Sequence, residues 1–267
     1  MKEIKHISSL QNPLIKKALS LKEKSRERKK SGLFVLEGRK EIELAIHGNY
    51  TIDTLLFCPE LISYETLETS LEIEKASLIS VSPEVYGKLA HRNTTEGVIA
   101  IAEAKNHNLE GVSFQTKNPL ILVAEAPEKP GNIGALLRTA DAANLDAVFI
   151  ANPKTDLYNP NIIRSSVGCV FSRKIFMADT SSIISILKEN GIALYCAALS
   201  ASKPYTGIDY KGPTAIVVGT EHSGLSDEWL SNSTQNIIIP MEGAIDSMNV
   251  SVSAAILIFE AKRQRLE

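Results

Sequence analysis

The sequence predicts an α/β protein in which a mostly parallel sheet follows a smaller α/β unit. After Pro119, short apolar runs alternate with helical patterns, and several of these runs lack the polar alternation of a half-exposed strand. Residues 106–118 are polar and without periodicity, which indicates a linker. With 267 residues, 44% apolar and 22% charged, the chain is long enough for two domains of a soluble globular protein.

The first domain is expected to cover residues 1–105. Ser82 and Pro83 predict a helix start, because serine caps helices and proline is tolerated in the first turn. The other expected elements are a helix over 12–30, a strand over 34–37, a helix over 39–47, and strands over 53–57, 78–81 and 97–102.

The second domain is expected to cover residues 119–267. Its predicted strands are 120–124, 147–151, 174–177, 192–197, 215–219 and 236–239. Its predicted helices are 132–144, 160–167, 181–190, 226–232 and 248–265. Strands that alternate with helices in this way favour a parallel sheet covered on both faces.

Positive charge is concentrated near the N-terminus although the net charge is −2. Residues 1–40 hold twelve Lys or Arg against four Asp or Glu, a balance of +8, which leaves −10 for the remainder. Within the run 22–30, the side chains of Lys24, Arg26, Arg28 and Lys30 are candidate RNA phosphate contacts. A solvated helix face would give the same pattern, so this run alone does not distinguish RNA contact from simple solvent exposure.

The chain shows no sign of export, membrane insertion or a metal site. Cys58, Cys169 and Cys196 are far apart and odd in number, which fits neither a disulfide framework nor a metal cluster. The first residues carry charges without a continuous apolar core, and no run approaches the roughly 20 apolar residues of a membrane helix. We therefore expect a cytoplasmic protein with no metal and no membrane partner.

The first of three polar clusters covers residues 125–140, where a strand gives way to a Pro/Gly turn and a helix. An apolar stripe of this helix faces the core: Ile133, Leu136, Leu137 and Ala140. Arg138 lies off that stripe, and Asn132 lies at the helix start. These two residues either belong to a functional site or are simply a helix-capping Asn and a surface Arg. The turn lacks the sequence of a P-loop and the spacing of a dinucleotide fingerprint.

The second cluster covers residues 215–226, where a buried strand runs directly into Gly219, Glu221 and Gly224. Ligands of open α/β sheets bind beyond the carboxyl ends of strands, and glycine there permits close backbone approach. An ordinary strand-to-helix loop capped by Ser226 is the alternative.

The third cluster covers residues 237–250 and precedes a long helix. Ser247 and Asn249 lie where that helix begins, so either simple capping or a site explains them.

In this order and spacing, the clusters resemble the three signature motifs of the SpoU (TrmH-like) family of the SPOUT superfamily. The matching segments are 132–140, 218–224 and 239–253. Residues 1–100 resemble the substrate-binding domain of the rRNA-modifying branch, through 32–39 and 94–100. Segment 158–168 also fits, except that Asn161 stands where the family commonly has Lys.

The resemblance implies a C-terminal trefoil knot, a homodimer, and S-adenosylmethionine as methyl donor for an RNA ribose 2′-hydroxyl. It implies Arg138 as the catalytic residue, with Asn132, Glu221, Ser247 and Asn249 shaping the site. The implied donor-binding residues are Gly219, Thr220, Ile239, Pro240, Met241, Met248 and Val250. Arg39 and Arg164 join the RNA-binding candidates.

The separate N-terminal domain favours 23S rRNA as the substrate. Two alternatives stay open: a tRNA ribose methyltransferase on the same scaffold, and a catalytically silent RNA-binding factor of ribosome assembly.

Overall fold

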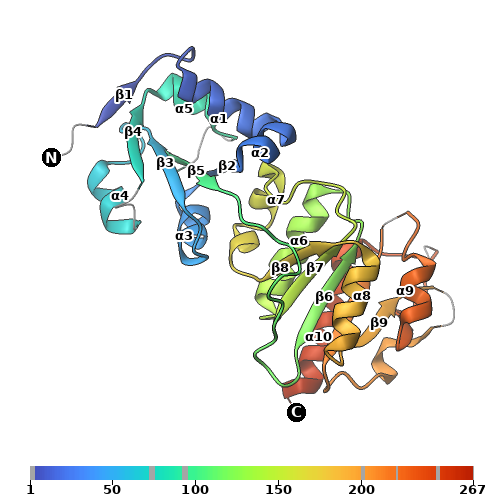
Figure 1. The fold of residues 1–267 in the computed structure, drawn as a ribbon. Helices are drawn as coiled ribbons and strands as arrows, with labels where there is room; N and C mark the ends of the chain where they lie inside the picture. Colours follow the sequence, from blue (N-terminus) through green and yellow to red (C-terminus); the bar gives the residue numbers. More distant parts are fainter. Residues whose placement is uncertain are drawn as a thin grey trace. The chain divides into compact units, whose positions relative to one another are not determined.

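The computed structural model describes residues 4–71, 76–91, 96–199, 202–220, 222–244 and 247–266 (Figure 1). The chain divides into two compact units, each with its own sheet. Unit 1 comprises Met1–Asn106 and Asp156–Ser172, and unit 2 comprises His107–Thr155 and Arg173–Glu267. The described residues contain no helix long and apolar enough to cross a membrane.

Unit 1 is built on a mixed five-stranded sheet of order β1-β4-β3-β5-β2. Its strands are β1 (Lys5–Ile7), β2 (Leu33–Glu37), β3 (Ile52–Phe57), β4 (Ser77–Val81) and β5 (Val98–Glu103). β5 is antiparallel to both its neighbours, whereas β1, β4 and β3 are mutually parallel. Its helical segments are α1 (Pro13–Glu23), α2 (Ser25–Ser31), α3 (Arg39–His47), α4 (Tyr64–Ser70), α5 (Pro83–Leu89), α7 (Pro160–Ser165) and η1 (Cys169–Phe171).

Local sequence patterns predict most of the helices and strands of unit 1. α3 has the predicted bounds, and the Ser82 side chain accepts a hydrogen bond from the Val85 N–H at the start of α5, as predicted. The single helix predicted over 12–30 is instead two helices, because Lys24 is extended, with φ −114° and ψ 110°.

Segment 156–172 belongs to unit 1, although it follows β7 of unit 2 in the chain. The ring of Tyr158 stacks on that of Phe34, with 4.3 Å between centroids, and the Phe171 ring lies at 5.8 Å from Phe34. Tyr50 completes this buried aromatic cluster. The sequence analysis assigned the segment to the C-terminal domain, whereas in the structure it belongs to unit 1.

Unit 2 contains a seven-stranded parallel sheet of order β10-β12-β9-β11-β6-β7-β8. Its strands are β6 (Leu120–Glu125), β7 (Ala147–Ala151), β8 (Ile175–Ala178), β9 (Ala193–Ala197), β10 (Lys203–Pro204), β11 (Thr214–Val218) and β12 (Gln235–Ile238). Its helical segments are α6 (Pro130–Ala142), α8 (Thr180–Glu189), η2 (Tyr205–Gly207), α9 (Asp227–Asn232) and α10 (Val250–Leu266).

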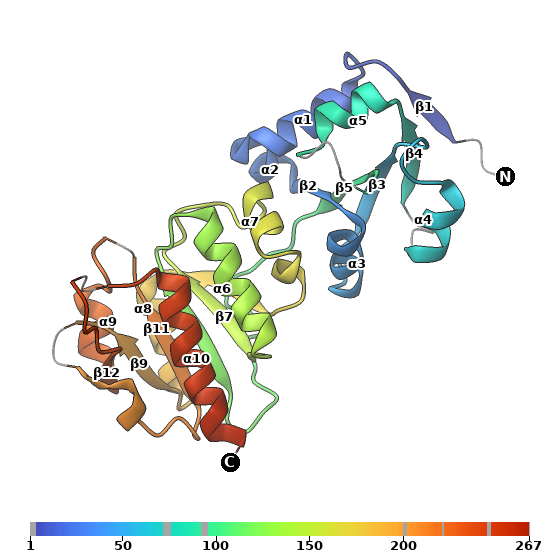
Figure 2. The ribbon, with the colours of Figure 1, turned by 180° about the vertical axis from the view of Figure 1, so that it is seen from behind.

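Helices cover both faces of this sheet. α8 and α9 lie over one face, and α6 and α10 lie over the other (Figures 1 and 2). β6, β7 and β11 are buried along their whole length, which explains their apolar runs without polar alternation. The prediction of an α/β fold with a parallel sheet is confirmed.

The expected linker packs on unit 2. Leu109, Val112 and Phe114 lie against its core cluster, and the His107 carbonyl accepts from the Met177 N–H at 2.6 Å. Residues 107–114 are therefore part of the folded unit.

Candidate active site

The three polar clusters of unit 2 follow strands that point the same way. The turn before α6 follows β6, the segment from Gly219 follows β11, and the segment from Ile239 follows β12. Because all the strands are parallel, their carboxyl ends lie at one edge of the sheet. This edge is where open α/β sheets bind ligands.

A hydrogen bond joins the first and third clusters. The Asn132 Oδ1 accepts from the Asn249 Nδ2 at 3.1 Å, across 117 residues of chain. The Asn249 Oδ1 also accepts from the N–H and hydroxyl of Ser251, at 2.9 and 2.6 Å, and so caps α10. Asn249 therefore both starts a helix and joins the two clusters.

Arg138 projects from α6 away from the core. The predicted stripe of Ile133, Leu136, Leu137 and Ala140 is buried, whereas Arg138 is exposed. Within the described part of the chain, its guanidinium has no ion-pair or hydrogen-bond partner. A free cation on the helix that starts beside the Asn132–Asn249 pair is available to an anionic ligand.

Residues after β11 form a tight loop. The Thr220 N–H donates to the Gly224 carbonyl at 3.0 Å, and the Gly224 N–H donates to the Thr220 carbonyl at 3.1 Å. A Cβ at Gly219 would lie 2.2 Å from the Gly224 carbonyl carbon, so only glycine fits. Glu221, expected in the site, lies outside the described residues.

Glu125 ties the carboxyl end of β6 to the start of α9. Its buried carboxylate accepts from the Ser226 N–H at 2.8 Å, the Ser226 hydroxyl at 2.7 Å and the Thr180 hydroxyl at 3.2 Å. Glu125 thus fixes the far end of the loop that begins at Gly219. The sequence analysis gave it no role, although a carboxylate that closes a buried apolar strand is itself a signal.

The segment after β12 supplies apolar surface. Ile239, Met241, Met248 and Val250 are half-buried, whereas Pro240 and Ser247 are exposed. Half-buried apolar side chains at the carboxyl edge of a parallel sheet are typical of the lining of a small-ligand site.

Most RNA-binding candidates of unit 1 are exposed, but Arg28 is not. Lys24, Arg26 and Lys30 face solvent, and so do Arg164 and Arg39, the latter 3.7 Å from Glu96.

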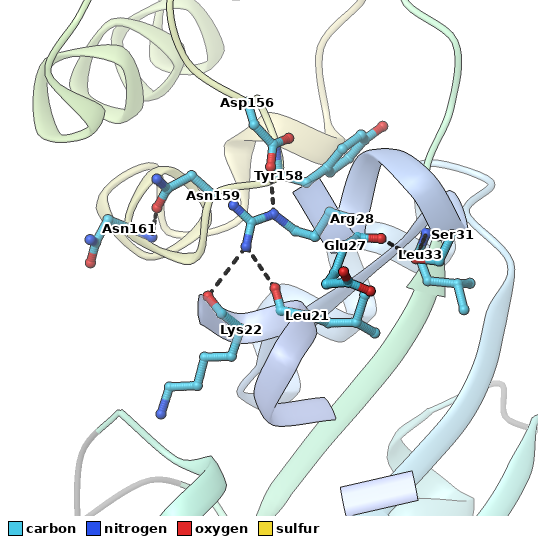
Figure 3. A network of polar contacts seen from close by, with 10 residues as sticks. All are labelled: Leu21, Lys22, Glu27, Arg28, Ser31, Leu33, Asp156, Tyr158, Asn159 and Asn161. Atoms are coloured by element: carbon cyan, nitrogen blue, oxygen red, sulfur yellow. Dashed lines mark hydrogen bonds and ion pairs between the residues drawn. The ribbon is translucent and has the colours of Figure 1, made fainter. Parts of the chain in front are cut away.

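Arg28 is only 5% exposed and belongs to the fold (Figure 3). Its Nε donates to the Asp156 carboxylate at 2.5 Å, and its Nη1 donates to the Leu21 and Lys22 carbonyls at 2.6 and 3.2 Å. A guanidinium that is buried and held through its Nε and Nη1 is part of the fold and not an exposed phosphate contact, so the expectation for Arg28 is corrected.

The sheet and its polar edge are typical of the class of α/β domains that bind a small ligand beyond their strand ends. Residues 119–259 match the SpoU rRNA Methylase family, and residues 12–100 match the MRM3-like substrate binding domain. The chain belongs to the SpoU rRNA methylase family, which confirms the resemblance.

Three known proteins illustrate the relationship. The 23S rRNA (guanosine(2553)-2′-O)-methyltransferase RlmP of Bacillus subtilis (strain 168) is 29% identical over 97% of this chain and 100% of its own length. The tRNA (guanosine(18)-2′-O)-methyltransferase of Thermus thermophilus is 36% identical over 62% of this chain and 85% of its own length. The AdoMet-bound rRNA methyltransferase from Sinorhizobium meliloti has a TM-score of 0.90 at 27% identity, with 99% of each chain covered.

Proposed function

We propose that this protein transfers a methyl group from S-adenosylmethionine to a ribose 2′-hydroxyl of 23S rRNA. The observation that carries the proposal is the Asn132–Asn249 hydrogen bond at the start of α6, the helix that carries the exposed Arg138. It brings residues of two family motifs together at the edge of the sheet where ligands bind.

The ribose hydroxyl must be positioned and must lose its proton. The donor, when bound, supplies an electrophilic methyl group. A guanidinium has no free lone pair with which to accept a proton, so Arg138 orients the hydroxyl and an adjacent RNA phosphate, and that phosphate accepts the proton. The paired amides of Asn132 and Asn249, with Ser247 and Glu221, shape the site around the reacting oxygen. Positioning of this kind supplies much of the rate of a two-substrate reaction.

The donor-binding residues lie on the two other segments. The backbone of Gly219 and Thr220 and the segment Ile239, Pro240 and Met241 hold the nucleoside and methionine portions, together with Met248 and Val250. The close approach at Gly219 and the half-buried apolar side chains support this assignment. The proposal includes the trefoil knot as the form of the pocket, and it requires no metal.

We further propose a cytoplasmic homodimer. Val252, Phe259 and Leu266 of α10 are spaced seven residues apart and are 48%, 49% and 84% exposed. Apolar side chains at this spacing lie on one face of a helix, and a second copy of the chain would bury them.

Unit 1 favours 23S rRNA over tRNA, since the tRNA enzyme of Thermus thermophilus matches only 62% of this chain. To test this, the purified protein is incubated with isotopically labelled donor and either 23S rRNA or tRNA, and the digested nucleosides are analysed by mass spectrometry. We expect a 2′-O-methylated nucleoside from 23S rRNA alone. Label in tRNA alone, or on a base, would contradict the proposal. Failure to bind the donor would support a silent assembly factor.

A further inference from the structure

Unit 1 contains a pocket of about 260 Å³ that the catalytic proposal does not use. Apolar side chains of β2, α5 and α7 form part of its wall, and charged or titratable groups complete it. The latter are Lys22, Glu37, Glu41, His91, Glu96 and Arg164. Its volume is slightly below the roughly 300–1,000 Å³ of common ligand pockets, which suits one flat ring system.

Glu37 gives this pocket an unused acceptor. Its Oε2 accepts from the His91 N–H at 2.8 Å. Its Oε1 is buried and has no donor among the residues that the structure describes. A buried carboxylate oxygen without a donor is costly, so a ligand that donates here gains a strong, charge-assisted hydrogen bond.

Cationic groups stand beside this carboxylate. The Lys22 Nζ donates to the Leu89 and Ala90 carbonyls at 2.7 and 2.9 Å, which fixes the ammonium at the pocket and leaves its third donor for a ligand. Among the described residues, the Arg164 guanidinium donates one hydrogen bond, from Nη2 to the Asn161 Oδ1 at 3.1 Å. The pocket therefore offers both a carboxylate acceptor and cationic donors.

The remaining titratable groups keep the pocket from being uniformly charged. Partial burial lowers the pKa of His91, and the neighbouring Lys22 and Arg164 cations lower it further, against an opposing effect of Glu37. Burial raises the pKa of Glu41, and the Glu96 and Glu37 carboxylates add to that rise. These shifts favour a neutral imidazole and ease the repulsion among the carboxylates.

Gly38 preserves the space at the turn between β2 and α3. Its φ is +100°, and a Cβ there would lie 2.5 Å from the Glu41 Oε2. A side chain would therefore be strained and would push the Glu41 carboxylate aside.

We propose that this pocket binds one unstacked guanine base of the RNA, an inference that rests on RNA being the substrate. The Watson–Crick edge of guanine carries adjacent N1–H and N2–H donors, which a carboxylate such as that of Glu37 accepts together. The O6 and N7 acceptors of guanine match the donors of Lys22 and Arg164. Adenine and cytosine each present one amino group and no adjacent ring N–H, and uracil presents no amino group. Unstacked bases read on this edge are the usual target of sequence-specific RNA recognition.

The test measures binding of the full chain to fluorescent RNA pentamers that differ only at the central nucleoside. Guanosine is compared with inosine, which lacks the N2 amino group, and with adenosine and uridine. Loss of one hydrogen bond to a charged acceptor should weaken binding of the inosine oligomer by about tenfold. Glu37→Gln should remove this discrimination, because its amide can still accept from the His91 N–H but lacks the charge.

Glu43→Gln is the matched control, since Glu43 is an exposed residue of α3 that does not line the pocket. It should keep the wild-type preference. Arg164→Gln should weaken binding of the guanosine oligomer more than that of the uridine oligomer. Equal binding of the guanosine, inosine and uridine oligomers by the wild-type chain would overturn the proposal. So would an unchanged preference in a folded Glu37→Gln variant.

Methyl transfer to 23S rRNA is measured on the same samples. A chain that methylates rRNA without any preference for guanosine overturns the pocket assignment alone. A chain that prefers guanosine but transfers no methyl group overturns the proposed reaction alone.

Discussion

At the scale of single residues, Asn249 combines a helix cap with a hydrogen bond that joins two of the polar clusters. Its Oδ1 caps α10 through Ser251, while its Nδ2 donates to Asn132. Each half of the amide serves one purpose, so replacement by Asp would keep the cap but lose the donor. The sequence left these two interpretations open, and the structure supports both.

Arg138→Ala should abolish methyl transfer, lowering turnover by about 100-fold or more, because the group that orients the hydroxyl is lost. Folding and donor binding should stay nearly intact, since Arg138 is exposed and off the buried stripe of α6. Single-turnover assays and calorimetry with the donor measure the two effects. Lys117→Ala, the control, removes an exposed charge of the same unit and should change neither turnover nor donor affinity. Near-normal turnover of the Arg138 variant would remove Arg138 from the mechanism.

Gly219→Ala should weaken donor binding without unfolding unit 2. The added methyl would meet the Gly224 carbonyl oxygen at 2.3 Å and the Leu225 nitrogen at 2.5 Å, so the loop must move. Overpacking of this kind costs about 1–3 kcal/mol, which corresponds to roughly tenfold or more in affinity if the loop bears it. Calorimetry should show no change for Gly212→Ala, where a Cβ meets nothing within 4 Å. Unchanged donor affinity in the Gly219 variant would place the donor elsewhere.

At the scale of elements, the break between α1 and α2 has a tertiary cause. The residues around it are good helix formers, so local propensity predicts one continuous helix. In the structure, the Arg28 side chain donates to the Leu21 and Lys22 carbonyls at the end of α1 and to the Asp156 carboxylate. Asp156 lies far away in the sequence, so no local pattern could predict the break.

Arg28→Met should destabilise unit 1. Arg28 and Asp156 are 5% and 8% exposed, and removal of one partner from a buried ion pair costs about 3–5 kcal/mol. Denaturant unfolding measures the loss, and Arg26→Met, which changes an exposed arginine of the same helix, is the control. Equal stability of the two variants would show that the buried pair does not hold segment 156–172.

The exposed cations of the α1–α2 region remain a proposed RNA contact, now without Arg28. Neutralising Lys24, Arg26 and Lys30 should weaken RNA binding and lower the log–log salt slope by about one unit per lost phosphate contact. Donor affinity should not change, because the proposed donor-binding residues are in unit 2. Neutralising Lys188, Lys203 and Lys211, exposed lysines of unit 2, should leave the slope alone. An unchanged slope in the Lys24, Arg26 and Lys30 variant would show that residues 22–30 are a solvated helix face that does not contact RNA.

At the scale of the whole molecule, the sequence predicts what is local and misses what is not. The bounds of β7 and α3 match the prediction, because apolar patterning and helix ends are encoded within each segment. β1 and β10 have only three and two residues, too few to show a period. α4 was missed because its sequence is mostly polar and buries only Leu67.

For the candidate site as well, the sequence predicts the residues within each motif but not the contacts between motifs. The family motifs identify Asn132, Arg138 and Asn249, but only the folded chain shows the hydrogen bond between the two amides. The pocket beside Glu37 was not predicted, because it combines side chains of α1, β2, α3 and α7 that no single motif contains. Long-range placement of this kind follows from tertiary packing rather than local pattern.

The membership of segment 156–172 in unit 1 changes what an isolated C-terminal fragment should do. A fragment of residues 107–267 retains the packed residues 107–114 and every proposed donor-binding residue. It should therefore bind S-adenosylmethionine and dimerise, yet methylate RNA poorly because residues 1–106 of unit 1 are absent.

The same fragment loses the partners of Tyr158 and Phe171, which are 6% and 3% exposed in the full chain and pack on Phe34. Exposed aromatic surface of this kind promotes aggregation and binds apolar dyes. A Tyr158→Ser, Phe171→Ser fragment should bind less dye and stay more soluble, with the same donor affinity by calorimetry. A folded fragment that binds no donor would show that the donor site needs unit 1. Low dye binding by the unmodified fragment would show that segment 156–172 can pack without unit 1.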